Sequence, residues 1–345
     1  MLVFFRTILF FCFCCHFLCA SEAGSFQVRV AIIRNAPTLE TVFQTPSKKE
    51  YTGTIRIIKN HQGKYDAINI LDIEDFLMGV IGQEMSPTAP LEALKAQAVA
   101  ARSHALYQVN ISANQPYDLV ANLSQAYAGK TELHKNVVLA IESTRGEILY
   151  YHGKPIPAFF HSSCGGHTES AVSVWQTISN IDGASSLELP PSVRCPYCAK
   201  SNGQKWNFEI SAATLKRILE QAGYSLGTFP TIAISEKATG GHAQTIAVHS
   251  NVGDFHLPAD KFRALLGYSC LSSTLFEISQ ETLPNGTPGD TFRFRGEGYG
   301  HGVGLCQYGA QEMAEQKASY DNILSYYFPN SYVQPYAPQT WASTR

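Results

Sequence analysis

One glutamate in the N-terminal third of the chain has neighbours that suit acid catalysis. Glu84 follows an apolar run in the segment IEDFLMGVIGQEM and is followed directly by Met85. Apolar neighbours disfavour the charged form of a carboxyl group, which raises its pKa and lets it deliver a proton at neutral pH. Glu84 is therefore a candidate general acid. A solvated surface glutamate is the alternative that these residues leave open.

Two cations follow on a predicted helix, PLEALKAQAVAARSHALYQ, which spans residues 90–108. Lys95 and Arg102 lie beside the apolar stripe that a period of 3.6 residues predicts, formed by Leu91, Leu94, Ala98, Ala101 and Ala105. A cation at the border of a buried face needs an anionic or sugar partner, or must extend to water. Both are candidates for substrate binding, and pairing with nearby carboxylates is the alternative.

Cysteine and histidine gather in the middle of the chain. The segment HSSCGGH contributes His161, Cys164 and His167, and RCPYC contributes Cys195 and Cys198. A C-x2-C pair with a further cysteine and a histidine has the composition of a structural zinc site. We expect Cys164, His167, Cys195 and Cys198 as its ligands. A disulfide from Cys164 to either cysteine of the pair fits the same residues.

A glycine-rich segment, GEGYGHGVGLCQYGA, occupies residues 296–310. It is not a dinucleotide-binding pattern, because its glycine spacing differs and no downstream acid follows a strand and helix. Closely spaced glycines let a backbone turn sharply and approach a ligand or another segment. We expect a loop in which His301, Gln307 and Tyr308 line a binding cleft, with Tyr299 or Tyr308 stacking on a sugar. For His301, a satisfied histidine in a structural turn is the alternative.

The elements predicted to position the candidate residues include both strands and helices. Alternating apolar residues predict strands and longer periodic segments predict helices. The predicted strands are residues 26–33, 51–58, 146–160 and 290–295, and the predicted helices are 90–108, 210–223 and 308–317. Strands and helices do not alternate regularly, so we predict an α+β fold, with mixed strands and helices around a central buried helix and a glycan-binding cleft.

The first residues predict export. Arg6 precedes an apolar run, Thr7 to Leu18, that ends in small residues at Ala20, Ser21 and Ala23. This is the pattern of a signal peptide, here residues 1–23, and an uncleaved anchor is the alternative. We therefore expect an exported protein of the periplasm or cell envelope.

The composition of the chain after residue 23 limits its possible cysteine chemistry, domain number and partners. The mature chain, residues 24–345, keeps Cys164, Cys195, Cys198, Cys270 and Cys306, an odd number that leaves at least one thiol free or bound to metal. It is long enough for one large domain or two intimate ones. The net charge is −2, and no basic patch indicates a nucleic-acid partner.

Several segments resemble, in the same order, the signature blocks of the SpoIID/LytB family, which includes stage II sporulation protein D and the amidase enhancer LytB. The similarity covers about residues 50–330, and the matching strings are IEDFLMGVIGQEM with APLEALKAQAVAARSHAL, DLVANLSQAYAGK, AFFHSSCGGHTESAVSVW, FRALLGYSCLSSTLF and GEGYGHGVGLCQYGAQEMA. The resemblance implies one SpoIID-like domain over residues 24–345.

Enzymatic members of this family are lytic transglycosylases that act on peptidoglycan glycan strands stripped of their peptides, and their acid matches Glu84. The 6-hydroxyl of N-acetylmuramic acid attacks its own anomeric carbon, so a second carboxylate is not needed. The product is a 1,6-anhydro sugar, and catalysis requires no cofactor. The alternative is a protein that binds glycan without cleaving it and enhances a partner N-acetylmuramoyl-L-alanine amidase.

The resemblance also implies roles for other residues. Lys95 and Arg102 become candidates for holding the saccharide or steadying the charge of Glu84. Gln125 and Tyr127 match a block that lines the groove. Cys306 stands where family members usually carry serine, and we interpret it as a small neutral replacement. A Cys306 and His301 nucleophilic pair is formally possible, but no third orienting group is apparent.

Overall fold

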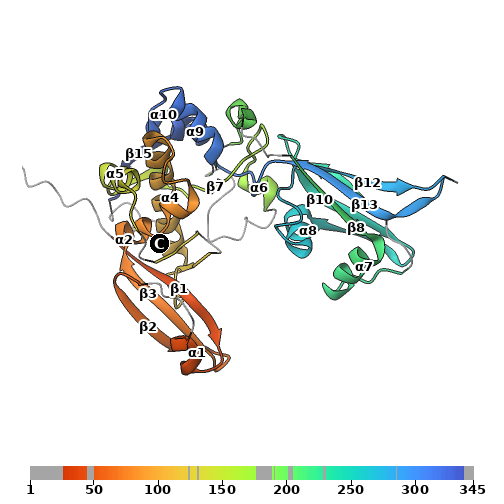
Figure 1. Ribbon diagram of the computed structural model, residues 1–345, viewed down its shortest axis with the longest axis horizontal. Coiled ribbons are helices and arrows are strands. Elements are labelled where there is room, and N and C mark those ends of the chain that lie inside the picture. The colour runs from red at the N-terminus through yellow and green to blue at the C-terminus, as the bar shows by residue number, and fades with distance from the viewer. Residues whose placement is uncertain are drawn as a thin grey trace, which may run out of the picture.

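The computed structural model describes residues 26–44, 50–122, 125–129, 132–175, 189, 191–200, 205–227, 231–284 and 286–337. The predicted signal peptide, residues 1–23, lies outside this part of the chain. The described residues form an α+β fold, as the sequence predicts, with a helical centre and several small sheets (Figure 1). Within the described ranges, no helix combines the length and apolar character needed to cross a membrane.

A four-stranded sheet forms one end of the first unit (Figure 1). Its order is β2-β3-β1-β4, and the bounds are Gln27–Ala36 for β1, Thr54–Lys59 for β2, Tyr65–Asp72 for β3 and Leu119–Val120 for β4. The short helix α1 (Leu39–Gln44) follows β1. The predicted strands 26–33 and 51–58 correspond to β1 and β2. This sheet leads directly into the helices that carry the candidate acid.

Helix α4 (Leu91–Ile111) is the centre of the first unit. Every residue from Ala96 to Tyr107 is buried, so the helix is covered on all sides and not only along the predicted stripe. Its neighbours include α2 (Ile73–Met78), α3 (Ile81–Glu84), α5 (Lys135–Ser143), α9 (Gln307–Glu315), α10 (Tyr320–Tyr327) and β5 (Glu147–Tyr151). β5 pairs with β6 (Lys154–Pro155) and β15 (Ser331–Pro335). The many alanines of α4 allow these neighbours to approach closely.

Residues 205–297 form a second unit at the opposite end of the long axis from α4 (Figure 1). Its two sheets have the orders β11-β10-β9 and β12-β13-β8. The bounds are β8 Lys205–Ser211, α7 Ala212–Gln221, β9 Thr231–Lys237, β10 Ala243–Ser250, β11 Gly253–Pro258, α8 Ala259–Leu266, β12 Phe276–Thr282 and β13 Pro288–Glu297. Its core is separate from the one around α4 and includes Phe262, Phe292 and Phe294. The family resemblance implied one domain and did not anticipate this second core.

The two units meet where residues 160–175 lie against the glycine-rich segment. β7 (Phe160–His161) pairs in parallel with β14 (Leu305–Cys306), and Ser163 exchanges backbone hydrogen bonds with Tyr299 at 2.9 and 2.8 Å. The short helix α6 (Ala171–Val174) and a 3-10 turn at Pro196–Lys200 lie nearby in the chain. Buried Glu169 accepts a hydrogen bond from the backbone N–H of Gly240 in the second unit at 2.9 Å. This junction holds the residues of the predicted zinc site.

Candidate active site

Glu84 is the last residue of α3, and its side chain is only partly exposed. The backbone N–H of Ala126 donates a hydrogen bond to Glu84 Oε1 at 2.5 Å, and the side chain of Gln307 hydrogen-bonds the same carboxyl group. Burial raises the pKa of Glu84, and the two hydrogen bonds oppose that rise without cancelling it. Glu84 therefore has the environment that its sequence neighbours predict for a general acid.

Gln307 connects Glu84 to the central helix. It is buried in the first turn of α9, and its Nε2 donates a hydrogen bond to Oε1 of Gln97 on α4 at 3.3 Å. Gln97 is fully buried, and its own Nε2 has no hydrogen-bond partner among the described residues. The C-terminal glycine-rich segment thus contacts the segment that carries Glu84 through a pair of amides, and a role for Gln307 in binding glycan stays a prediction.

Gln125 and Tyr127 lie on either side of Ala126 and are both buried. Gln125 Nε2 donates to the carbonyl of Ala101 at 3.1 Å, and the Tyr127 hydroxyl donates to Oδ1 of Asn69 at 2.6 Å. Neither side chain is open to a ligand in this arrangement. Gln125 and Tyr127 were expected to line the groove, and their burial contradicts this. Instead, their hydrogen bonds hold the segment whose Ala126 N–H faces Glu84.

The side chain of Arg102 is also fully buried. Its Nε and Nη2 donate to the two carboxylate oxygens of Glu74 at 2.9 and 2.7 Å, and Nη1 donates to the carbonyl of Glu147 at 2.9 Å. The carboxylate pairing left open by the sequence is the one observed. With no exposed surface on its side chain in this structure, Arg102 contributes to the packing of the first unit.

Lys95 is 19% exposed and pairs with Glu92 at 2.7 Å. Its ammonium also lies 5.6 Å from the ring centre of Tyr320, whose backbone N–H donates to Glu92 at 2.9 Å. Carboxylate pairing is again observed, and this group is tied to the start of α10. A role for Lys95 in binding glycan stays a prediction.

The glycine-rich segment is locked against residues 159–163. Gly298, Gly300, Gly302 and Gly304 all have positive φ. A Cβ atom on Gly304 would lie 2.2 Å from the carbonyl oxygen of Phe159, so only glycine fits there. The close approach to another segment is the one that the sequence predicts.

His301 lies inside this locked segment. Its ring centre is 5.1 Å from that of Trp175 and 5.5 Å from that of His161, and Nδ1 accepts a hydrogen bond from Val303 N–H at 3.0 Å. Burial holds the pKa of His301 well below its ordinary value, and His161 adds to the effect. This packing is the satisfied structural histidine that was the alternative.

Tyr308 follows Gln307 directly and is 43% exposed. Tyr299, the other aromatic residue proposed for stacking, is 56% exposed. Exposed aromatic rings can stack on a sugar, so a stacking role for Tyr308 or Tyr299 stays a prediction. Of the predicted binding residues, Gln307 is the one whose side chain interacts with the Glu84 carboxyl group.

The predicted metal ligands are partly regrouped. Cys164, Cys195 and Cys198 lie together and are buried, but the fourth member of the group is Cys306. His167 instead places its Nδ1 2.6 Å from the carbonyl of Thr168. Cys306 therefore takes the place in the group that was predicted for His167. The reason is the pairing of β14 with β7, which brings Cys306 next to the other three cysteines.

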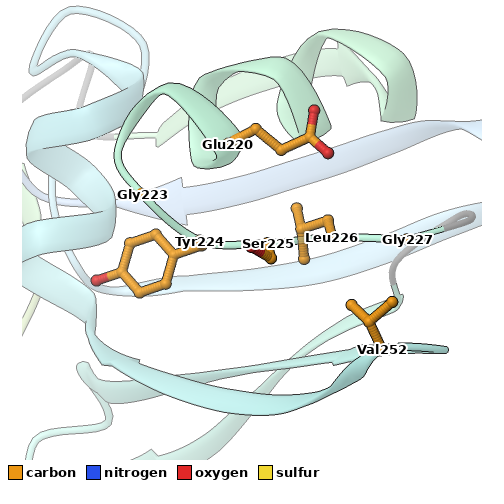
Figure 2. Close-up of a pocket in the computed structure, with 7 residues that line it drawn as sticks. All are labelled: Glu220, Gly223, Tyr224, Ser225, Leu226, Gly227 and Val252. Carbon is orange, nitrogen blue, oxygen red and sulfur yellow. The ribbon is translucent and has the colours of Figure 1, made fainter.

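A pocket of about 380 Å³ opens in the second unit, beside the end of α7 (Figure 2). It is lined by Glu220, Gly223, Tyr224, Ser225, Leu226, Gly227 and Val252. Figure 1 shows α7 at the other end of the molecule from α2 and α4, so this hollow is remote from Glu84. The predicted glycan-binding cleft is not identified with it.

Sequence reasoning missed two contributors to the site. For Gln97 the sequence carries a visible signal, because it is a polar residue among many small ones on the predicted helix. The Ala126 N–H is a backbone group and carries no signature of its own.

Comparisons with known proteins were made over the whole chain. The SpoIID family, described as "Stage II sporulation protein", matches residues 61–151. A "Domain of unknown function (DUF8618)" matches residues 198–304, a range that includes the whole second unit. An uncharacterized protein of Brachyspira hyodysenteriae is 34% identical over 81% of this chain and 71% of its own length. Stage II sporulation protein D of Bacillus subtilis is 30% identical, with 77% and 76% covered. The amidase enhancer of Bacillus subtilis is 29% identical over 75% of this chain but only 40% of its own length.

Proposed function

Because the chain belongs to the SpoIID family, we propose that it is a lytic transglycosylase that cleaves peptide-stripped glycan strands of peptidoglycan, with Glu84 as general acid and base. A role connected with the cell wall is supported by the relatives named as a sporulation protein and an amidase enhancer. The proposed place of action is outside the cytoplasm, in the periplasm or cell envelope, because the first 23 residues have the pattern of a signal peptide.

One observation carries this proposal: three segments that are far apart in the sequence meet at the carboxyl group of Glu84. Ala126 and Gln307 bind it from two sides, while burial raises its pKa. A carboxyl group held in a fixed orientation and kept protonated to a higher pH than usual is suited to protonating a leaving group.

The proposed reaction uses this one group twice. Protonated Glu84 transfers its proton to the glycosidic oxygen, and the bond from that oxygen to the anomeric carbon of N-acetylmuramic acid breaks. The 6-hydroxyl oxygen of the same sugar bonds to the anomeric carbon, and the Glu84 carboxylate accepts the hydroxyl proton. The products are a 1,6-anhydro end and a new free hydroxyl, and no water is consumed.

The proposed route needs only one carboxyl group from the protein. Hydrolytic glycosidases need a second carboxylate as nucleophile or base. In the proposed reaction the substrate's own 6-hydroxyl takes the place of that second group. A mechanism in which the substrate supplies its own nucleophile requires nothing more from the protein.

The test compares Glu84→Gln with the parent on peptide-free glycan strands, with anhydro-muramyl ends measured by mass spectrometry. The substitution keeps size and hydrogen bonding but removes the transferable proton, so we expect a loss of about a hundredfold or more. Glu315→Gln is the matched control, since Glu315 is exposed on α9. Cleavage by Glu84→Gln at the parental rate would show that another group is the acid.

The similarity to an amidase enhancer favours a second candidate function, in which the protein binds glycan and accelerates a partner amidase without cleaving the strand. Binding of strands by both the parent and Glu84→Gln, with acceleration of an N-acetylmuramoyl-L-alanine amidase and no anhydro product from either, would establish this function in place of the first.

A further inference from the structure

Four cysteine side chains converge at the junction of the two units. Cys164, Cys195, Cys198 and Cys306 are all buried, and their sulfur atoms lie within 4.8 Å of one another. The sulfurs of Cys164 and Cys198 are 3.5 Å apart. Four sulfurs bound at about 2.3 Å to one tetrahedral metal ion are separated by about 3.8 Å. The observed separation of 3.5 Å is close to that value, and the limit of 4.8 Å on the others is compatible with it.

Three separate stretches of chain create this convergence. The backbone N–H of Cys195 donates to the carbonyl of Gly166 at 2.8 Å, which fixes the C-x2-C turn beside Cys164. The parallel pairing of β7 and β14 brings Cys306 from the C-terminal region to the same place. The group is therefore built by backbone pairing on both sides and does not depend on one flexible loop.

From this geometry we propose that Cys164, Cys195, Cys198 and Cys306 bind one zinc ion as a closed structural site. Four sulfur ligands in a tetrahedral arrangement select zinc or iron among the common metals, and a site closed by four protein ligands is structural. Zinc is the redox-inert choice, which suits a site with no room for a substrate. The predicted ligand His167 has no part in this set.

The surroundings of the sulfurs support metal binding. The Tyr327 hydroxyl lies 3.1 Å from the sulfur of Cys195 and is positioned to donate to a thiolate. Gly309 on α9 gives this sulfur space, because a Cβ atom there would lie 2.9 Å from it. Hydrogen bonds to ligand sulfurs are the outer contacts that orient and tune metal sites.

Disulfides account less well for the cluster. A disulfide joins two sulfurs at about 2.05 Å, so two disulfides would divide four cysteines into two bonded pairs. Here the four sulfurs form one mutually close group, and Cys270, the fifth cysteine of the mature chain, lies outside it. A shared central ion requires such a group.

The site would also stabilise the candidate active site, a consequence that rests on the proposed function. Cys306 is the residue before Gln307, and Gln307 binds both Glu84 and Gln97. A metal ion holding Cys306 therefore fixes the start of α9 and the amide that faces the acid.

The decisive measurement is the metal content and thiol state of the mature chain purified without chelator. We expect about one zinc ion per chain, five free thiols after denaturation, and an X-ray absorption shell of about four sulfurs at about 2.3 Å. Glu84→Gln should keep its zinc, so failure of the proposed catalysis and failure of the metal site are separate results.

Matched variants identify the ligands. Cys306→Ser should lose bound zinc, whereas Cys270→Ser and His167→Ala should retain it fully. Tyr327→Phe should bind zinc about 10 to 100 times more weakly, because it removes an outer hydrogen bond. If Cys306→Ser does not fold, the sulfur count in the parent and the zinc content of His167→Ala still decide the ligand set.

Four results would overturn the proposal. The first is metal-free parent protein whose mass shows oxidised cysteine pairs, and the second is metal-free protein with all thiols reduced. The third is zinc that is lost in His167→Ala but kept in Cys306→Ser. The fourth is iron in place of zinc.

Discussion

The buried pair of Arg102 and Glu74 gives the sharpest test of how the first unit is held together. We consider Arg102→Met, which keeps an unbranched side chain but removes the charge. Glu74 would then keep the Gly146 N–H, at 3.1 Å, as its hydrogen-bond donor within the described residues, while its side chain is 6% exposed. Removing one partner of a buried ion pair costs about 3–5 kcal/mol, because the remaining charge is left unpaired.

This loss should be plain in thermal and urea unfolding. For a unit of this size, each kcal/mol lowers the melting temperature by about 2–4 °C, so Arg102→Met should lower it by about 6–20 °C. The double variant Glu74→Gln with Arg102→Met should lose less than the sum of the single variants, since no unpaired charge remains. Lys95→Met is the control, because it breaks a partly exposed pair and should cost less than about 1 kcal/mol.

The reasoning fails if Arg102→Met melts within about 2 °C of the parent. An unchanged melting temperature together with lost glycan binding would return Arg102 to the role of a sugar-binding residue. Additive losses in the double variant would show that the pair is not coupled.

Other outcomes follow from the raised pKa of Glu84 and its neighbours. The folded state holds the Glu84 proton more tightly than the unfolded state, so stability from this group is complete below about pH 4 and is lost as the pH rises through the folded pKa. Melting curves against pH should therefore show Glu84→Gln at least as stable as the parent at pH 7 and without that gain at low pH. Gln307→Leu removes a hydrogen bond that lowers the Glu84 pKa, so the alkaline fall in cleavage rate should move to higher pH. Tyr127→Phe leaves a buried acceptor without its donor and should cost about 1–3 kcal/mol in urea unfolding. Mass spectrometry of the secreted chain should find the N-terminus near Ser21 or Gly24, and an intact start on a cytoplasmic protein would contradict export.

The fold class and the environment of Glu84 could be predicted because both follow from local patterns. The apolar run before Glu84 indicates burial, and the 3.6-residue period before Arg102 indicates a buried helix face. A helical period identifies which face of a helix is buried, but it does not identify the segments that pack on that face. Glu74, the actual partner of Arg102, could not be identified from the helix alone.

What the sequence could not show has the same origin, in contacts between distant segments. Cys306 was interpreted as a small neutral residue because nothing local indicates that β14 pairs with β7. The sequence left open one large domain or two intimate ones, and the separate core of residues 205–297 is visible only once strands distant in the chain are paired.

The long separation of Gln97 and Gln307 along the chain determines when, during synthesis and folding, the candidate active site can form. These two amides are hydrogen-bonded across 210 positions of sequence. During synthesis Glu84 and Gln97 leave the ribosome long before α9 and α10 are made. The packing of α4 is therefore incomplete until these two neighbouring helices are present. Contacts of such high sequence separation form late in folding, because a long loop must close first. A growing chain, or one truncated before α9, therefore carries the acid without its amide partner, and the proposed cleavage begins only after α9 has been made and has packed on α4.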